Sequence, residues 1–291
     1  TMEDPQSKRN FRVSYYDKVG FRGIGEKALV AILKDDVIER KKLEHFCIRF
    51  PIPNNYRDLI WEILLHILPS HQQSHKFVMV QRTQQYDDLH RALEVMKKID
   101  TDTELPVQFL KMHLTETGKL HLKFKDEKWH EFFYAVGNAV CELVDSPAIA
   151  YWITVSLHSF FTENKYIEHK EAFHIIVTST VKKENNALFT KLNDLDVFHN
   201  LPFDLWYAEC YAHVFPPSGG IERIWDLLLG RACRILPYIA AQILLTFERH
   251  LLHCANLQSC LSVLKNVPFS EATSSLIIGK GIELWKKMEK I

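Results

Sequence analysis

One stretch of the sequence shows the pattern on which the fold depends: Ile221-Glu222-Arg223-Ile224-Trp225-Asp226-Leu227-Leu228-Leu229. Its apolar side chains recur at intervals of three and four residues, as they do on one face of an α-helix. A proline pair at 216–217 and a glycine pair at 219–220 precede it, and Ser218 or the glycines can open a helix there. The stretch therefore predicts a short helix that begins near Ile221 and buries one side.

The same helical period recurs through most of the chain, and few segments alternate as half-buried strands do. Prolines and glycines separate the apolar stripes and divide the chain into roughly a dozen helices. The longest loops are expected in the polar segments 100–106 and 117–128, and no linker splits the chain into halves. We therefore expect an all-α protein, with a flexible N-terminus at residues 1–10 and a single helical domain of two lobes over residues 11–291.

Composition and charge exclude several classes of function. Of the 291 residues, 47% are hydrophobic and 25% are charged, which is typical of a folded globular protein. Lys plus Arg and Asp plus Glu number 36 each, so no net basic field favours binding to nucleic acid. The longest apolar run, residues 235–247, is shorter than a membrane span of about 20 residues and is interrupted by Pro237 and Gln242. We therefore expect neither a nucleic-acid-binding protein nor a membrane span.

The cysteines and the start of the sequence indicate the compartment. Six cysteines without a C-x-x-C pair, in a chain of this size, indicate reduced thiols. The polar, acidic stretch at residues 1–5 lacks the apolar core of a secretory signal. We therefore expect a cytoplasmic protein.

Three histidines are the best candidates for a metal site. His71 and His75 are four residues apart, so a helix would place both imidazoles on one face, and His66 lies near them. Gln72 stands where a zinc protease has its glutamate, and no nearby acid or cysteine supplies a third ligand. A solvated helix start after Pro69 is the better interpretation. Phosphate-binding loops and nucleophile elbows are also missing from the sequence, so we expect no metal, no cofactor and no nucleophilic catalysis.

Two tryptophans occur in related settings, Arg57-Asp58-Leu59-Ile60-Trp61 and Arg223-Ile224-Trp225-Asp226. On a helix Arg57 and Trp61 share a face, so the guanidinium can lie against the indole while the ring anchors the core. We expect both tryptophans to be buried, and Arg57 and Asp226 to pair with neighbouring groups. Considered singly, each is most simply an ordinary core tryptophan.

Four motifs follow one another along the chain: Arg57-x-x-x-Trp61-x-x-Leu64-Leu65, Ala150-Tyr151-Trp152-Ile153, Leu201-Pro202-Phe203-Asp204-Leu205-Trp206 and Arg223-Ile224-Trp225-Asp226-x-Leu228-Leu229. In this order they resemble the TBC domain, the all-helical domain of proteins that activate Rab-type small GTPases. The resemblance extends from about residue 47 to residue 250. It implies a structural role for the motif residues Arg57, Trp61, Trp152, Trp206, Arg223, Trp225 and Asp226.

Active members of that family supply the GTPase with an arginine from I-x-x-D-x-x-R and a glutamine from Y-x-Q-G. At the corresponding places this chain reads Ile99-x-x-Asp102-x-x-Leu105 and Tyr134-Ala135-Val136-Gly137. Neither Leu105 nor Val136 can donate a hydrogen bond, and an arginine finger contributes about 10³ to 10⁵ in rate. The resemblance therefore implies a GAP fold that is not an enzyme. The alternative is an active Rab GAP that uses other residues, such as the cations Arg91, Lys97 and Lys98 near the first motif.

Residues 15–23, 151–154 and 243–247 resemble one branch of the family in particular, the branch that belongs to the tuberous sclerosis complex. That resemblance implies an adaptor that binds the coiled coil of hamartin, with tuberin in the same complex, and supports GTPase activation on Rheb and restraint of mTOR signalling. It also implies recruitment to vesicle or lysosomal membranes through partners. A small GTPase, Rab or Rheb, is the other partner that the family implies.

The apolar stripe after the first motif is the predicted partner site. Adaptable side chains there suit a groove for an amphipathic helix, with a lysine as the charged rim. The residues are Val107, Leu110, Lys111, Met112 and Leu114. The alternative, that this stripe packs a short helix onto the domain, remains open.

Overall fold

The computed structural model describes residues 22–120, 127–163, 170–266 and 269–290. Over these ranges the chain forms fourteen α-helices and no β-strand, apart from an isolated antiparallel bridge between Val37 and His71. The all-α prediction is confirmed. The N-terminus expected to be flexible, residues 1–10, lies outside the described residues, as do residues 15–21 of the segment 15–23 and residues 121–126 of the loop predicted at 117–128.

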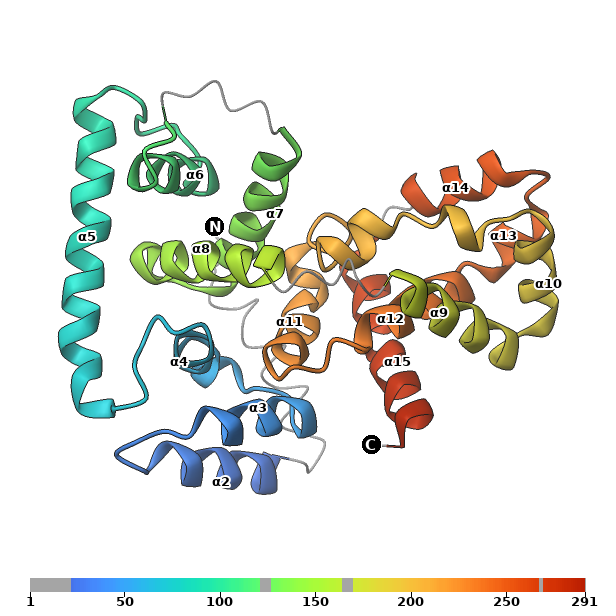
Figure 1. Cartoon of the computed structure of the whole chain (residues 1–291), viewed down its shortest axis with the longest axis horizontal. Coiled ribbons are helices and arrows are strands. Elements are labelled where there is room, and N and C mark those ends of the chain that lie inside the picture. The colour runs from blue at the N-terminus through green and yellow to red at the C-terminus, as the bar shows by residue number, and fades with distance from the viewer. Residues whose placement is uncertain (1–21, 121–126, 164–169, 267–268, 291) are drawn as a thin grey trace, which may run out of the picture.

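Figure 1 shows two lobes that meet at α11. The first lobe contains α2 (Arg22–Leu33), α3 (Arg40–Arg49), α4 (Asn54–Leu64), η1 (Gln72–Ser74), α5 (His75–Val95), α6 (Leu105–Glu116), α7 (Glu127–Leu143) and α8 (Pro147–Glu163). The second contains α9 (Lys170–Glu184), α10 (Asn186–Asp194), η3 (Phe198–Asn200), η4 (Asp204–Ala208), η5 (Pro217–Gly219), α11 (Ile221–Leu229), α12 (Ile235–Thr246), α13 (Glu248–His253), α14 (Leu257–Asn266) and α15 (Glu271–Glu289). Because α11 packs against α3, α4, α12 and α15, it connects both lobes.

The glycine pair before α11 determines where that helix begins. Gly220 has a φ of 96°, in the left-handed region that residues with a side chain rarely adopt. A Cβ on Gly219 would lie 2.7 Å from the Cβ of Ser274 in α15, so only a glycine allows this approach. The predicted helix start at Ile221 is confirmed, and the same residues position α15.

The centre of the core is a buried carboxylate that joins α4 to α11. The indole Nε1 of Trp61 donates to Asp226 Oδ1 at 2.7 Å, and Arg57 Nη2 donates to Asp226 Oδ2 at 3.4 Å. Arg57 Nη2 also donates to the carbonyl of Ile52 at 3.0 Å. The predicted pairing of Arg57 and Asp226 is confirmed, and the arginine and the tryptophan meet at this one carboxylate. Burial raises the pKa of Asp226 to about 6, although Arg57 and Trp61 both favour its ionised form.

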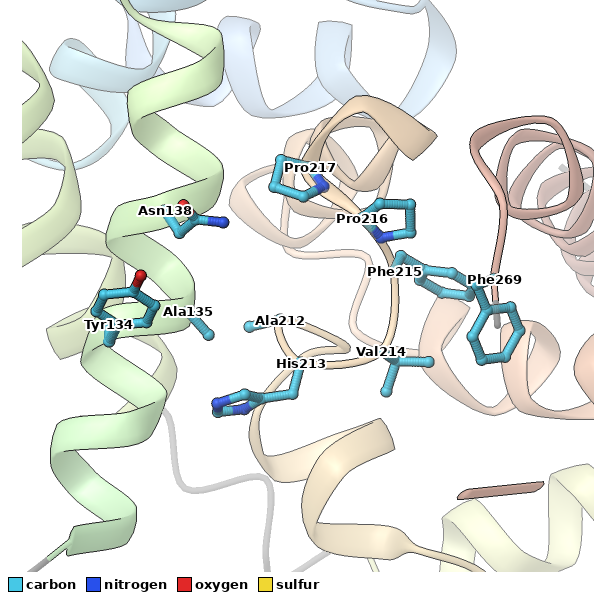
Figure 2. Close-up of a pocket in the computed structure, with 10 residues that line it drawn as sticks. All are labelled: Tyr134, Ala135, Asn138, Ala212, His213, Val214, Phe215, Pro216, Pro217 and Phe269. Atoms are coloured by element: carbon cyan, nitrogen blue, oxygen red, sulfur yellow. The ribbon is translucent and has the colours of Figure 1, made fainter. Parts of the chain in front are cut away.

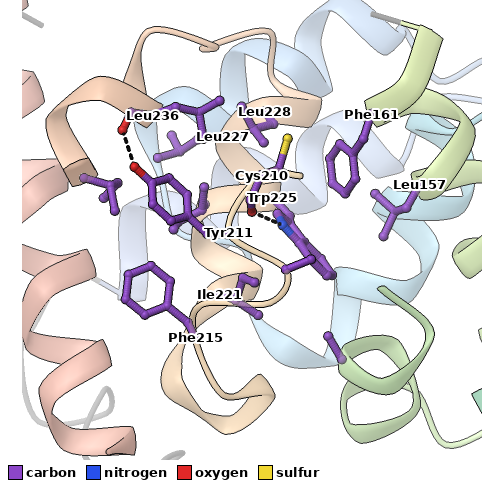
Figure 3. Packing of buried hydrophobic residues seen from close by; sticks show 14 of the residues in the cluster. Leu157, Phe161, Cys210, Tyr211, Phe215, Ile221, Trp225, Leu227, Leu228 and Leu236 are labelled. Carbon is purple, nitrogen blue, oxygen red and sulfur yellow. Dashed lines mark hydrogen bonds between the residues drawn. The ribbon is translucent and has the colours of Figure 1, made fainter. Parts of the chain in front are cut away.

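The other motif tryptophans are also in the core, as expected: Trp61, Trp152, Trp206 and Trp225 are at most 5% exposed. Trp225 donates from Nε1 to the carbonyl of Cys210 at 3.1 Å (Figure 3). Beside it, the hydroxyl of Tyr211 donates to the carbonyl of Leu236 at 2.8 Å. These bonds satisfy the polar atoms of large aromatic side chains, which allows the rings to be buried completely.

The Asp226 contact can be tested with a double-mutant cycle. Asp226→Asn is expected to lower the free energy of unfolding by about 3–5 kcal/mol, because it leaves the Arg57 guanidinium buried without an anionic partner. Arg57→Met should then cost less in the Asp226→Asn background than in the parent chain. Chemical denaturation measures all four variants, and costs that add to within about 0.5 kcal/mol would contradict the pairing.

Candidate functional site

The two segments that resemble the catalytic motifs lie together where α6 begins beside α7. The hydroxyl of Tyr134 donates to Glu104 Oε2 at 2.7 Å, and this bond raises the pKa of Tyr134. One turn further along α7, a Cβ on Gly137 would lie 3.3 Å from the Cβ of Pro106, so the glycine allows the two helices to approach closely. Segments about 30 residues apart in the sequence thus form one surface.

Leu105 is the first residue of α6 and is 38% exposed on this surface. The preceding loop is closed by its own hydrogen bonds: Thr103 Oγ1 donates to Asp100 Oδ1 at 2.6 Å, which lowers the pKa of Asp100. Gln108 Nε2 donates to the carbonyl of Thr103 at 2.6 Å. The loop predicted over residues 100–106 therefore ends earlier than expected, since the helix already includes Leu105 and the residue after it.

Val136, which stands where the family pattern has its glutamine, lies in the core. Its side chain is fully buried, on the side of α7 that faces the core. The next residue, Gly137, lies against Thr154 of α8, where an added Cβ would be 3.4 Å from the threonine methyl group. The valine at position 136 is therefore not presented to solvent, whereas Tyr134, two residues earlier on α7, is half-buried.

A hollow of about 360 Å³ opens beside Tyr134 (Figure 2). One wall is α7, with Ala135 and Asn138, and the other is the segment 212–217, joined by Phe269. Figure 2 shows the ring of His213 pointing from this segment toward α7. His213 Nδ1 lies 2.6 Å from Glu209 Oε2, and this hydrogen bond raises the pKa of the imidazole. This hollow could not be predicted from local sequence patterns, because its two walls are more than 70 residues apart in the chain.

Aromatic rings of α7 pack against one histidine of α6 and one of α8. His158 lies 4.7 Å from the ring of Trp129, and His113 lies 5.6 Å from that of Phe133. Burial lowers the pKa of His158 to about 4 and lowers that of His113 as well. The imidazoles are therefore neutral at physiological pH and serve the packing of α6, α7 and α8.

The histidines considered for a metal site are not arranged around a common point in the described residues. His75 begins α5, after the predicted start at Pro69, and its Nε2 lies 2.8 Å from the carbonyl of Pro69. Across the described ranges, no group of three His, Cys, Asp or Glu side chains is arranged to hold a metal ion. Nor does any helix in those ranges have the length and apolarity needed to cross a bilayer.

The stripe predicted to bind a partner faces mainly inward. Met112 is fully buried and Leu114 is 8% exposed, because the helical period of α6 turns them toward the core. Val107, Leu110 and Lys111 are half-buried, and Lys111 Nζ donates to the carbonyl of Lys98 at 2.7 Å. The prediction is therefore corrected for Met112 and Leu114, which pack α6 onto the domain.

The neighbouring helix α5, unlike α6, exposes several apolar side chains on one face. Phe77, Val80 and Val95 are 69%, 55% and 76% exposed. With the exposed Gln84 and Arg91 they follow a spacing of three, four, seven and four residues, which is one face of a helix. We call these five residues the α5 stripe. The sequence contains this signal as apolar residues at helical spacing.

The fold defines the class of protein, a TBC domain. The chain is similar to the Ypt/Rab-GAP domain of Gyp1p, with a TM-score of 0.51 and 13% identity over 89% of this chain and 96% of that domain. It is also similar to the TBC domain of a Chlamydomonas flagellar RabGAP, with a TM-score of 0.55 and 12% identity over 89% and 92%.

Its relatives identify the family. The chain is 37% identical over 284 residues to TBC1 domain family member 7 of Xenopus tropicalis and of Homo sapiens, which covers 97% of this chain and 96% of each relative. The Danio rerio protein of that name is 33% identical over 292 residues, 98% of this chain. No protein-family model matches the chain. It belongs to the family of TBC1 domain family member 7.

Proposed function

We propose that this chain is a non-catalytic TBC-domain adaptor of the tuberous sclerosis complex, where it binds the coiled coil of hamartin alongside tuberin. There it supports GTPase activation on Rheb and restraint of mTOR signalling, in the cytoplasm and, through its partners, at vesicle or lysosomal membranes. The observation that carries the proposal is the α5 stripe, in which the apolar side chains of Phe77, Val80 and Val95 are exposed on one helix face. It lies next to the surface formed by the start of α6 and by Tyr134 of α7, which we call the finger surface.

The finger surface supports a role other than catalysis. Leu105 presents an apolar side chain where the family pattern has its arginine, and residue 136 is buried. The exposed cations Arg91, Lys97 and Lys98 are the residues through which a Rab-activating alternative would have to work. A cation replaces an arginine finger only if it reaches the transferred phosphoryl group. The Rab-activating alternative merits a test because the two similar solved structures are named as Rab GAP domains.

The α5 stripe suits a coiled-coil partner in length and in spacing. α5 has 21 residues and, at about 1.5 Å per residue, spans about 31 Å at the edge of the first lobe (Figure 1). Phe77, Val80, Gln84 and Arg91 have heptad spacing, with Asp87 at the intervening position. A partner helix can therefore pack on the apolar first turns of α5 and meet polar side chains further along. The apolar residues at the two ends of the α5 stripe would contribute affinity, and the polar residues between them would specify the register of the partner helix.

The purified chain is expected to accelerate single-turnover GTP hydrolysis by no more than a few fold, across a panel of Rab proteins and Rheb. The reason is that leucine occupies position 105, where the family pattern has its arginine, and valine occupies position 136, where it has its glutamine. The control is the TBC domain of an active Rab GAP, assayed with its own substrate. An acceleration of about 10³ by this chain, the scale of an arginine finger, would establish the catalytic alternative.

Charge in the α5 stripe should abolish partner binding. Phe77→Glu with Val80→Glu is expected to reduce co-purification with a hamartin coiled-coil fragment by at least about tenfold, because two carboxylates would be desolvated in an apolar contact. The thermal transition of the isolated chain should move by only a few degrees, since both side chains are more than half exposed.

Ile175→Glu is the matched control, because Ile175 is 66% exposed on α9 in the other lobe. This variant should bind the fragment like the parent chain. Binding that survives both charges in α5 would place the interface elsewhere. Met112→Glu is unsuitable as a test, because the buried charge would disrupt the packing of α6.

A further inference from the structure

Three cationic side chains from three helices line one small pocket. Arg49 ends α3, Arg223 is in α11 and Lys286 is near the end of α15. Figure 1 shows α11 next to both other helices. Arg223 was assigned to a structural motif, but it is only half-buried and its guanidinium lies over α15, 3.9 Å from where a Cβ on Gly279 would be.

These three cations are without a carboxylate partner in the described part of the chain, whereas neighbouring basic residues have one. Lys287, next to Lys286, lies 2.8 Å from Glu184, and Arg234 lies 3.0 Å from Glu289. Three like charges around one pocket repel one another, so an anion placed between them is favoured.

The acidic residue in the pocket wall does not neutralise them. Asp226 also lines the pocket, but it is 3% exposed and its two oxygens accept from Arg57 and Trp61. That carboxylate is therefore already engaged with Arg57. Glu222, the residue before Arg223, also acts on Arg57 and Asp226. Neither acid forms an ion pair with the three cations in the described part of the chain.

The size and the walls of the pocket favour a phosphate on a peptide. Its volume is about 50 Å³, several times the ~10–15 Å³ that one water needs on the same measure, so the pocket admits a group of a few heavy atoms such as a tetrahedral oxyanion. Guanidinium groups bind phosphate oxygens through paired N–H donors, and lysine adds a point charge. Phe50, Pro51 and Ile282 form an apolar wall beside it, which an extended segment can contact. Because the whole chain has a net charge of 0, no broad basic field favours an anionic membrane.

We propose that this pocket binds a phosphoserine or phosphothreonine side chain of a partner protein, with Arg49, Arg223 and Lys286 around the phosphate. The site lies apart from α5, so it can bind a phosphorylated partner whether or not a coiled coil is bound to α5. Its failure would leave the adaptor function untouched, since the two surfaces share no residue.

The test uses the full chain and a fluorescein-labelled library of peptides with a central phosphoserine flanked by degenerate positions. Fluorescence polarisation should show binding about tenfold tighter than for the unphosphorylated library. Inorganic phosphate should compete with the labelled peptides. Arg49→Glu with Lys286→Glu should weaken binding of the phosphorylated library at least about tenfold, because two attractive charges become repulsive.

Lys41→Glu with Lys280→Glu is the matched control, since both lysines are exposed on the same two helices and do not line the pocket. It should change binding by less than about twofold. Both double variants should still bind the hamartin fragment, which shows that they are folded. Equal affinity for the two libraries, or equal losses in the two double variants, would overturn the proposal. Binding only to vesicles of phosphatidylcholine with phosphatidylinositol phosphates would overturn it in favour of a lipid headgroup.

Discussion

The carboxylate of Asp226 is the contact on which the joining of the two lobes depends. It accepts from Trp61 and Arg57 of α4, while its own helix, α11, packs against α12 and α15 of the second lobe. A buried charge pair gains little over an apolar contact in stability, but it is costly to break and permits only one register. The network therefore fixes how α4 meets α11, and the tryptophans fill the space around it.

This arrangement determines which surfaces are left for partners. With α8 packed on α4 and α7, α7 buries Val136 and presents Tyr134 to the start of α6. The other side of α8 contacts α5, so that the outer face of α5 has no covering helix in the described part of the chain. The proposed adaptor function therefore uses α5, whose outer face is exposed, and leaves the start of α6 free.

Much of the fold could be predicted from the sequence, and less of the site. The helix at 221–229, its glycine start and the burial of Trp225 follow from local pattern. The bond from Trp61 to Asp226 spans 165 positions, so local spacing could not show it. Met112 was expected to face a partner but is buried, because a helical stripe indicates that one face is covered without indicating what covers it. For the same reason the sequence cannot show whether the apolar residues of the α5 stripe are buried in the core or exposed to a partner.

Hydrogen exchange of the chain with and without the hamartin coiled coil tests the central claim most directly, namely that α5 is the partner surface and the finger surface is not. Binding suppresses local opening, so amides in the contacted helix exchange more slowly. Peptides that cover α5 should be protected in the complex, while those covering the start of α6 and the part of α7 around Tyr134 should exchange as in the free chain. Protection of the finger segments with unchanged exchange in α5 would contradict the account.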